Sequence, residues 1–392
     1  MEAFIFDAVR SPRGKARPDG PLAGLEPAAM VAQLAQALDQ RVEGAIGEAD
    51  ALILGCVTQT GAQGGHIALL SKFRAGLPDA ATAISVNNFC VSGLSAIGMA
   101  VARVALGSDR AVLAGGVEHM SLVPMMGDKA SYYRDMSYPV KSRFVPVAIG
   151  ADRLAATWAV ARDLLDAAAL ASQSRAVAAE ADPALSRSRI PLRDATGAVI
   201  LQADETIRPT TPEKLAGLAP AFGELSKTFA AALEGESVEP VHTIAHAPPM
   251  VDGAALAVVG ARDAFAVPPR ARVVAFAEAG GDPHASLTAG FAAMEKCLAQ
   301  AGLTLADMDR IEFMEAFAVT VARFLRDYPV DGAKVNVAGG ALSRGHPLGA
   351  SGGVLLSSLL DTLDTCNGRY GLAVGAGGSG VGAAILIERG EF

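Results

Sequence analysis

Cysteine is scarce in this sequence of 392 residues, which contains four: Cys56, Cys90, Cys297 and Cys366. Because four cysteines without a Cys-x-x-Cys pair do not make a disulfide framework in so long a chain, we expect a reduced protein of the cytoplasm. Long apolar runs are missing as well. None reaches the roughly 18 residues of a membrane-spanning helix, so we expect no membrane span. The first four residues also lack the basic stretch of a secretory signal.

Positive charge is outnumbered, with 33 Lys and Arg against 41 Asp and Glu and a net charge of −8. This balance argues against nucleic acid as the main partner, and an anionic ligand would need a local basic patch. Hydrophobic residues make up 51% of the chain. That share and the length predict two or three structural units around a large core.

Two kinds of apolar pattern alternate along most of the chain. Short apolar runs predict strands, and apolar residues at helical spacing predict helices between them. Strands are expected at 3–9, 51–57, 83–89, 110–116, 254–260, 271–277, 310–314, 371–374 and 382–388, and helices at 30–38, 67–73, 287–301 and 316–325. Such alternation is typical of a parallel or mixed sheet covered by helices, so the expected fold class is α/β.

The stretch from Met120 to about Pro249 interrupts this alternation. It contains polar, irregular segments, a strong alanine-rich helix at 164–179 and several prolines. We interpret it as an inserted loop domain. The second half of the chain then repeats the order of the first: a strand, a glycine turn and an apolar helix occur around both Cys90 and His346.

Cys90 is a candidate nucleophile. It lies where the predicted strand 83–89 meets a helix that carries Leu94, Ile97 and Val101 at helical spacing. Unpaired backbone N–H groups and the positive end of the helix dipole at such a place favour the thiolate, which is the nucleophilic form. The alternative is a buried structural cysteine.

His346 mirrors Cys90 in the other half of the chain. The segment 336–353 is predicted to run from a strand through a glycine-rich turn into an apolar helix, with His346 on the turn and Pro347 at the first helical position. A histidine placed there is a candidate base or oxyanion donor. The alternative is a polar residue that only satisfies local hydrogen bonds.

These residues carry a family resemblance. Asn87-x-x-Cys90-x-Ser92-Gly93 and Gly339-Gly340-x-x-x-x-Gly345-His346-Pro347-x-Gly349-Ala350-Ser351-Gly352 resemble the two signature segments of the thiolases, enzymes that make or cleave 3-oxoacyl-CoA thioesters. Further matches follow in the family's order at residues 10–15, 75–78, 115–121, 252–255, 315–318 and 370–373. So many ordered matches over the whole length are not explained by chance.

The resemblance implies a five-layer αβαβα fold of two similar halves with mixed sheets, plus a loop domain over the active site. The N-terminal half would comprise 1–119 and 250–268, the inserted loop domain 120–249 and the C-terminal half 269–392. The resemblance further implies a homodimer or homotetramer, a role in fatty acid metabolism and a coenzyme A thioester as substrate, with no permanently bound cofactor and no metal.

Two positions depart from the family pattern in the expected active site. The family's Asn or His before Glu-Ala-Phe, which helps to polarise the thioester carbonyl, is Met314 here, followed by Glu315; methionine donates no hydrogen bond. The family's second cysteine, which moves the proton at the α-carbon, corresponds to Ala376. Gly378 in the same segment is a further expected active-site position.

The region before Asp252 also departs from the family pattern, since the loop between Phe222 and Thr243 is about fifteen residues longer than usual and Pro248 replaces the serine expected before Asp252. In thiolases this region lies against the pantetheine arm of coenzyme A. The resemblance therefore makes His246 and Pro248 candidate contacts of that arm, with Arg208, Lys214 and Lys227 as candidate phosphate contacts, although surface solvation explains those cations as well.

Two other motifs are weaker. Gly375-x-Gly377-x-x-Gly380 fits a dinucleotide-binding pattern, but a strand and the end of the sequence follow instead of a helix, so a tight turn near Cys90 is the better interpretation. His242 and His246 have a zinc-like spacing without a third ligand, and Pro248-Pro249 argues against a helix to present them.

We therefore expect an acyltransferase of the acetyl-CoA C-acyltransferase type that works through an S-acyl-Cys90 intermediate with His346 as base. Several alternatives stay open. The enzyme could have a changed reaction: acyl transfer to another nucleophile, thioester hydrolysis, or condensation without the second cysteine. From a different class, the chain could be a weakly catalytic thiolase-like subunit, although retention of both Cys90 and His346 counts against that.

Overall fold

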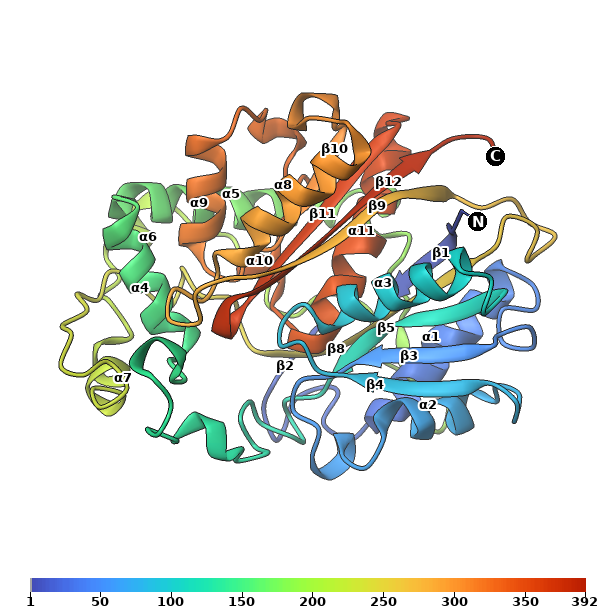
Figure 1. Cartoon of the computed structure of the whole chain (residues 1–392), viewed down its shortest axis with the longest axis horizontal. Coiled ribbons are helices and arrows are strands. Elements are labelled where there is room, and N and C mark those ends of the chain that lie inside the picture. Colours follow the sequence, from blue (N-terminus) through green and yellow to red (C-terminus); the bar gives the residue numbers. More distant parts are fainter. Residues whose placement is uncertain (1) are drawn as a thin grey trace.

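The computed structural model describes residues 2–392 and alternates strands with helices in both halves of the chain (Figure 1). The first half contains β1 Phe4–Arg10, β2 Gly14–Lys15, α1 Pro27–Arg41, β3 Ala51–Gly55, α2 Ile67–Ala75, β4 Thr82–Val86, α3 Ser92–Ala105, β5 Ala111–Glu118 and β8 Val251–Gly260. The second contains β9 Ala271–Gly280, α8 Ala289–Ala301, β10 Arg310–Phe313, α9 Ala318–Asp327, α10 Ala341–Arg344, α11 Ser351–Cys366, β11 Tyr370–Gly377 and β12 Val381–Arg389. The predicted α/β class is confirmed.

The two halves have related strand orders. The first runs β4-β3-β5-β8-β1 across the sheet, and the second runs β10-β11-β12-β9, which matches the first without its edge strand β4. In each half the strands nearest the outer edge are parallel and the others antiparallel. The halves join where β1 pairs with β9 through only two residue pairs, Phe4 with Arg272 and Ile5 with Ala271. The repeat expected from the sequence is therefore a repeat of topology.

Three apolar cores separate the layers. One lies between α1, α2 and the outer face of the first half-sheet, and another lies between α8, α9 and the outer face of the second. The third fills the space between the half-sheets, where α3 and α11 pack together. Figure 1 shows these two helices in the middle of the molecule. The layers are therefore α, β, α, β, α, and both central helices begin next to Cys90 or His346.

The strand predicted before His346 is not formed. Only one bridge, from Val335 to Ile311, remains of it. The physical reason is Asn336, whose side-chain Oδ1 accepts from Phe313 N at 2.8 Å and whose Nδ2 donates to Phe313 O at 2.9 Å. One amide side chain thus takes over the ladder bonds of a strand residue, and the chain turns away with Asn336 at φ 46°.

The helix after His346 also begins later than predicted. The residues after Pro347 form a 3₁₀ turn, Leu348–Ala350, and α11 begins at Ser351. Pro347 is therefore not the first residue of the helix. Because of this extra turn, His346 lies five positions before the helix. Its ring nitrogen Nδ1 lies 2.8 Å from the hydroxyl oxygen of Ser351, the first residue of α11.

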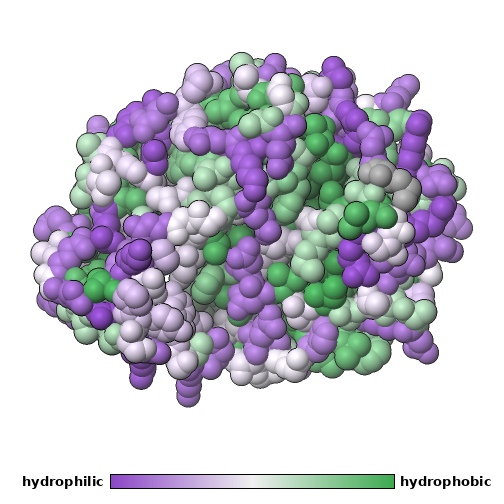
Figure 2. Space-filling model, in the orientation of Figure 1, coloured by the Kyte–Doolittle hydropathy of each residue, from purple (hydrophilic) through white to green (hydrophobic). Residues whose placement is uncertain are grey.

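The residues between β5 and β8 form α4 Val147–Thr157, α5 Arg162–Ala179, α6 Pro212–Ala216, α7 Gly223–Thr228 and the small hairpin of β6 Leu192–Arg193 with β7 Val199–Leu201. Figure 1 shows α4, α6 and α7 at the left, whereas the hairpin is bonded to α1. The face shown in Figure 2 mixes hydrophilic and hydrophobic side chains. Within residues 2–392, no helix combines the length and apolar character needed to cross a membrane.

Candidate active site

Cys90 lies in the turn between β4 and α3, as the sequence predicts. Phe89 adopts a left-handed conformation at φ 45°, and Ser92 closes the turn by donating to Phe89 O at 2.6 Å and accepting from Asn88 N at 2.8 Å. The end of β11 covers the cysteine from the other side: a Cβ added to Gly377 would lie 3.2 Å from Cys90 Cβ. The thiol is therefore held between the start of a helix and a glycine-rich strand end.

The predicted thiolate is not the resting form of Cys90. Removal from water raises the pKa of the Cys90 thiol to about 11, and the nearby Glu118 adds to the increase. The backbone N–H groups of Gly378 and of Cys90 itself lower the pKa, but by less than desolvation raises it. Cys90 as a whole residue is half-buried, yet desolvation of its charged form outweighs the helix-start effect. The cysteine is consequently a neutral thiol at pH 7.

His346 is a buried, neutral imidazole. Burial, with a further contribution from Arg13, lowers its pKa to about 4. Its backbone N–H donates to Pro249 O at 3.0 Å, which places the loop with Pro248 next to this turn. Nδ1 lies 2.8 Å from Ser351 Oγ, and Nε2 has no partner among the described residues. The free Nε2 is therefore the atom available to reacting groups.

Close glycine contacts bring the two turns together. A Cβ on Gly93 would lie 2.7 Å from Gly349 O, and one on Gly352 would lie 2.2 Å from Leu94 N. Leu348, two residues after His346, shares a small apolar cluster with Cys90. No hydrogen bond joins the Cys90 thiol to His346 in the described part of the chain. The structure thus places both residues at the same junction of α3 and α11 without direct bonding.

Glu118 ties the loop after β3 to the histidine turn. This buried carboxylate accepts hydrogen bonds from Val57 N at 2.9 Å, Thr58 N at 3.1 Å and Gln63 Nε2 at 3.1 Å. It also accepts from Gly349 N at 3.0 Å, three residues after His346. Burial raises the pKa of Glu118, while these donors lower it. A single carboxylate therefore connects the end of β3 with the histidine turn.

The two departures from the family pattern lie at the ends of β10 and β11. Met314 is 1% exposed, and its Cε would lie 3.3 Å from a Cβ on Gly375. Side chains alternate along a strand, so Ala376 points to the face opposite Gly377. It packs against Gly290 in the first turn of α8, where an added Cβ would lie 2.9 Å from Ala376 Cβ. Neither side chain supplies a proton or a hydrogen bond.

Glu315 is fully engaged in the structure. It accepts from Ser172 Oγ at 2.7 Å, from Asn336 Nδ2 at 3.0 Å and from Leu342 N at 3.0 Å. These donors belong to α5, to the turn after Val335 and to α10. Burial raises the pKa of Glu315, and the donors lower it. Glu315 thus anchors the segment around Met314 and has no donor or acceptor facing a substrate.

The two loop histidines form separate pairs. His242 Nδ1 lies 2.7 Å from Asp152 Oδ1, and His246 Nε2 lies 2.7 Å from Asp166 Oδ1. Burial lowers the pKa of His246 to about 4, although Asp166 opposes the shift. Ala318 N donates to His246 O at 2.9 Å, which fixes this loop against the start of α9. Both histidines therefore bind the loop to α4 and α5.

The three candidate phosphate contacts are all exposed. Arg208 lies between β7 and α6, Lys214 on α6 and Lys227 on α7. Lys227 already forms an ion pair with Glu224. The structure does not bring these cations together with Cys90 and His346 through any hydrogen bond or ion pair in residues 2–392. They remain candidates on the surface of the region between β5 and β8.

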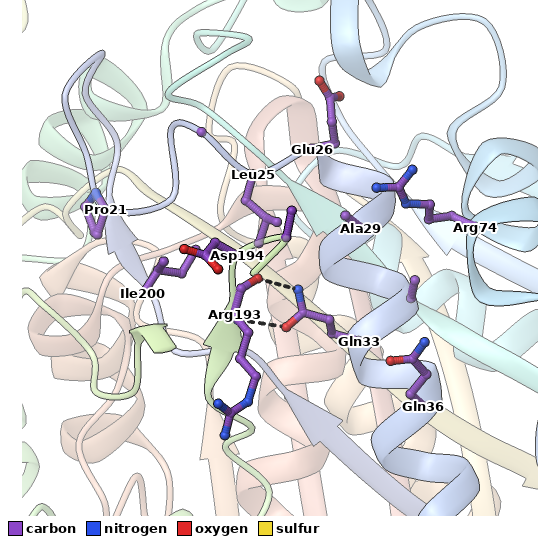
Figure 3. Close-up of a pocket in the computed structure, with 13 residues that line it drawn as sticks. Pro21, Leu25, Glu26, Ala29, Gln33, Gln36, Arg74, Arg193, Asp194 and Ile200 are labelled. Atoms are coloured by element: carbon purple, nitrogen blue, oxygen red, sulfur yellow. Dashed lines mark hydrogen bonds between the residues drawn. The ribbon is translucent and has the colours of Figure 1, made fainter. Parts of the chain in front are cut away.

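A groove of about 410 Å³ lies elsewhere on the molecule, between α1 and the β6–β7 hairpin (Figure 3). Gln33 donates to Arg193 O and accepts from Arg193 N, both at 2.9 Å, so the hairpin is fastened to the helix there. None of the candidate site residues lines this groove. The size of this groove is therefore no evidence that the reaction takes place in it.

Four functional candidates were not identified from the sequence: Arg13, Glu118, Glu312 and Ser351. Ser351 and Glu118 lie inside the family-like segments but have no chemical pattern of their own. Glu312 did carry a signal, because a carboxylate in the middle of a short apolar strand is unusual and needs a partner. Arg13 became visible only when folding placed it beside His346.

Comparison with known proteins agrees with the fold. A model of the thiolase N-terminal domain matches residues 3–262, and one of the thiolase C-terminal domain matches residues 267–389. The chain belongs to the thiolase family, and it is an enzyme of the acyltransferase class.

Relatives with assigned activities match nearly the whole chain. The chain is 34% identical to a beta-ketoadipyl-CoA thiolase of Pseudomonas putida and 32% identical to a 3-ketoacyl-CoA thiolase of Bacillus subtilis, each over 99% of both chains. It is 33% identical to an acetyl-CoA acetyltransferase of Shinella zoogloeoides over 91% of this chain and 92% of the relative. The names differ in acyl group, so they indicate the class of reaction rather than one substrate.

Proposed function

We propose that this enzyme transfers acyl groups between an acyl-CoA or 3-oxoacyl-CoA and an acceptor through an S-acyl-Cys90 intermediate, with His346 as the base. The observation that carries the proposal is the pairing of the two turns. A thiol at the start of α3 and an imidazole with a free Nε2 before α11 are held at one helix junction by the close contact of Gly93 with Gly349, and Glu118 accepts from Gly349 N. This arrangement matches a nucleophile and its base.

The pKa values define when the thiol reacts. With a thiol pKa of about 11 and an imidazole pKa of about 4, a resting ion pair is strongly disfavoured. The proton therefore moves from Cys90 to His346 only as sulfur attacks the acyl carbon. The backbone N–H groups of Gly378 and Cys90 lie close to the sulfur and are suited to stabilise the oxyanion that forms on the acyl oxygen.

The carbon–carbon step lacks the family's second cysteine. Ala376 carries no proton and Met314 donates no hydrogen bond, so acylation of Cys90 is expected to be faster than removal of an α-proton from a second acyl-CoA. These two residues favour the changed-reaction alternatives: acyl transfer to another nucleophile, thioester hydrolysis or condensation that relies on His346 alone. The free Nε2 of His346 argues against a subunit without catalysis.

The substrate side is the region between β5 and β8. We propose that it receives the coenzyme A moiety, with His246 and Pro248 near the pantetheine arm and Arg208, Lys214 and Lys227 as phosphate contacts. Pro248 precedes Pro249, whose carbonyl accepts from His346 N. A cytoplasmic location, a role in fatty acid metabolism and assembly as a homodimer or homotetramer stay predictions.

Incubation with acetyl-CoA followed by intact-mass measurement and peptide mapping tests the proposal. We expect one acetyl group on the peptide that contains Cys90. His346→Ala should slow its formation by about 10²–10⁴-fold, the range for loss of a general base. Cys90→Ser should abolish the thioester adduct, and Cys366→Ser, a half-buried cysteine on α11, is the matched control. Unchanged acetylation of Cys90→Ser would disprove the assignment.

A further inference from the structure

Two buried glutamates three positions apart, Glu312 and Glu315, differ in their hydrogen bonds. Glu315 accepts from three donors, whereas no described residue donates a hydrogen bond to the Glu312 side chain. Both residues are 3% exposed. The Glu312 oxygens are not among the fully enclosed polar atoms without a partner, so they border open space rather than packed protein. The open space beside Glu312 therefore decides what this carboxyl group can bind.

Glu312 faces a small cavity next to the candidate base. The cavity has a volume of about 20 Å³, close to the space that one water molecule occupies. His346, Ser351, Arg13 and Ser358 line it together with Glu312. Arg13 Nε is buried and has no hydrogen-bond acceptor among the described residues. The cavity is therefore polar, and a carboxylate, a hydroxyl and a guanidinium N–H border it.

Four charged residues act on Glu312. Burial and repulsion from Glu315 raise the pKa of Glu312 to about 8, while Arg344, Arg13 and Arg10 act in the opposite direction. These arginines share one carboxylate, Asp204, which accepts from all three. The neutral His346 on the cavity wall completes the titratable groups. Asp204, Glu180 and Glu315 balance the three arginines, so burial dominates, and Glu312 ionises only as the pH rises through about 8.

We propose that ionised Glu312 sets the tautomer of His346 through Ser351, and thereby prepares Nε2 to accept the Cys90 proton. The carboxylate attracts the Ser351 hydroxyl proton into the cavity, through one water molecule. Ser351 Oγ then accepts from His346 Nδ1–H across the observed 2.8 Å contact. Nε2 keeps its lone pair. With neutral Glu312 the hydroxyl is free to donate to Nδ1, which places the ring proton on Nε2 and blocks the base.

The step balances with coenzyme A as the leaving group. As the Cys90 S–acyl bond forms, the Cys90 S–H bond breaks and its proton binds Nε2. As the acyl–sulfur bond to coenzyme A breaks, that proton passes from Nε2 to the departing sulfur, and coenzyme A leaves as a thiol. Throughout this exchange Nδ1 keeps its proton, Glu312 stays ionised, and no oxidant or other reactant is needed. Glu312 acts through His346 and is thus a positioning residue, and its role in turnover rests on the proposed acylation of Cys90.

Titration of the His346 ring without substrate is the first test. In protein labelled with ¹³C-histidine, the ring-carbon shifts distinguish the two neutral tautomers, and His346→Asn assigns the signal. We expect the His346 signal to change near pH 8 in the wild type and to lose this change in Glu312→Gln. Ser358→Ala, which alters the same cavity without changing a charge, should keep it. An identical titration in wild type and Glu312→Gln would overturn the proposal.

The pH profile of Cys90 acetylation by acetyl-CoA is the second test. Above pH 8 we expect Glu312→Gln to be about tenfold to a hundredfold slower than wild type, with the step near pH 8 removed. Glu312→Asp should restore part of the rate and a pH step, which also controls for misfolding. A uniform loss of acetylation rate at all pH values, without recovery in Glu312→Asp, would show that Glu312 only supports the fold and would overturn the proposal. If wild type is never acetylated while the ring titration depends on Glu312, the acyltransferase proposal fails and the coupling stands.

Discussion

Alkylation of Cys90 by iodoacetamide separates two opposing physical effects at the start of α3. The helix dipole and free N–H groups favour the thiolate, whereas burial disfavours it. In the structure burial dominates and raises the pKa of Cys90 to about 11. At pH 7 the thiolate fraction is then about 10⁻⁴, against roughly 3% for a free cysteine with a pKa near 8.5. The difference in thiolate population is about 300-fold.

A more basic thiolate is also a better nucleophile, which offsets part of this difference. With a Brønsted coefficient of about 0.4–0.5, a pKa higher by about 2.5 increases the intrinsic reactivity roughly 10- to 20-fold. Cys90 should therefore react about 15- to 30-fold more slowly than a free cysteine at pH 7. Its rate should rise about tenfold per pH unit up to pH 10, without a plateau.

The assay is the rate of carbamidomethylation of the Cys90 peptide between pH 6 and pH 10, followed by mass spectrometry. Peptide mapping keeps Cys90 separate from the half-buried Cys366, and the buried Cys56 and Cys297 should stay unlabelled in the folded protein. A plateau with an apparent pKa below 8 would refute the reasoning, because it would show that the helix-start groups outweigh desolvation.

Three further predictions follow from the same structure. Gly93→Ala should destabilise the protein by about 1–3 kcal/mol in urea unfolding and reduce acylation, since its Cβ would lie 2.7 Å from Gly349 O; Gly24→Ala, with nothing within 4 Å, is the neutral control. Ala376→Cys should leave exchange of acetyl-CoA α-protons, measured by NMR as deuterium loss, nearly unchanged, because the new thiol would face Gly290 of α8 on the side of β11 opposite Cys90; a rise of about tenfold or more would show that a thiol at 376 reaches the substrate. Because the pKa of Glu312 is raised to about 8 on folding, its contribution to stability is complete below the unfolded pKa near 4.3 and is lost as the pH rises through about 8. Glu312→Gln should therefore gain stability relative to wild type between pH 5 and pH 9, and a constant difference in urea midpoint would contradict this.

Much of the fold could be predicted from local patterns. The apolar runs that became β1, β3, β5, β8 and β12, and the helical spacing that became α1, α2 and α8, depend on residues close in sequence. The position of Cys90 before α3 was predicted for the same reason. The strand expected before His346 failed because the side chain of Asn336 replaces it, and that replacement requires Phe313, which is 23 residues away.

The sequence by itself determined the α/β class, the repeated order of strand, turn and helix, and the two turns that carry Cys90 and His346. These follow from periodicity and from family-like segments, which are local properties. Only the tertiary structure decided the protonation states and the partners. Desolvation of Cys90 and His346 depends on how completely distant segments cover them, and the cavity shared by Arg13, Glu312 and Ser351 joins segments more than 300 residues apart. Charge and burial act through space, so the chemistry of this site is set where those segments meet.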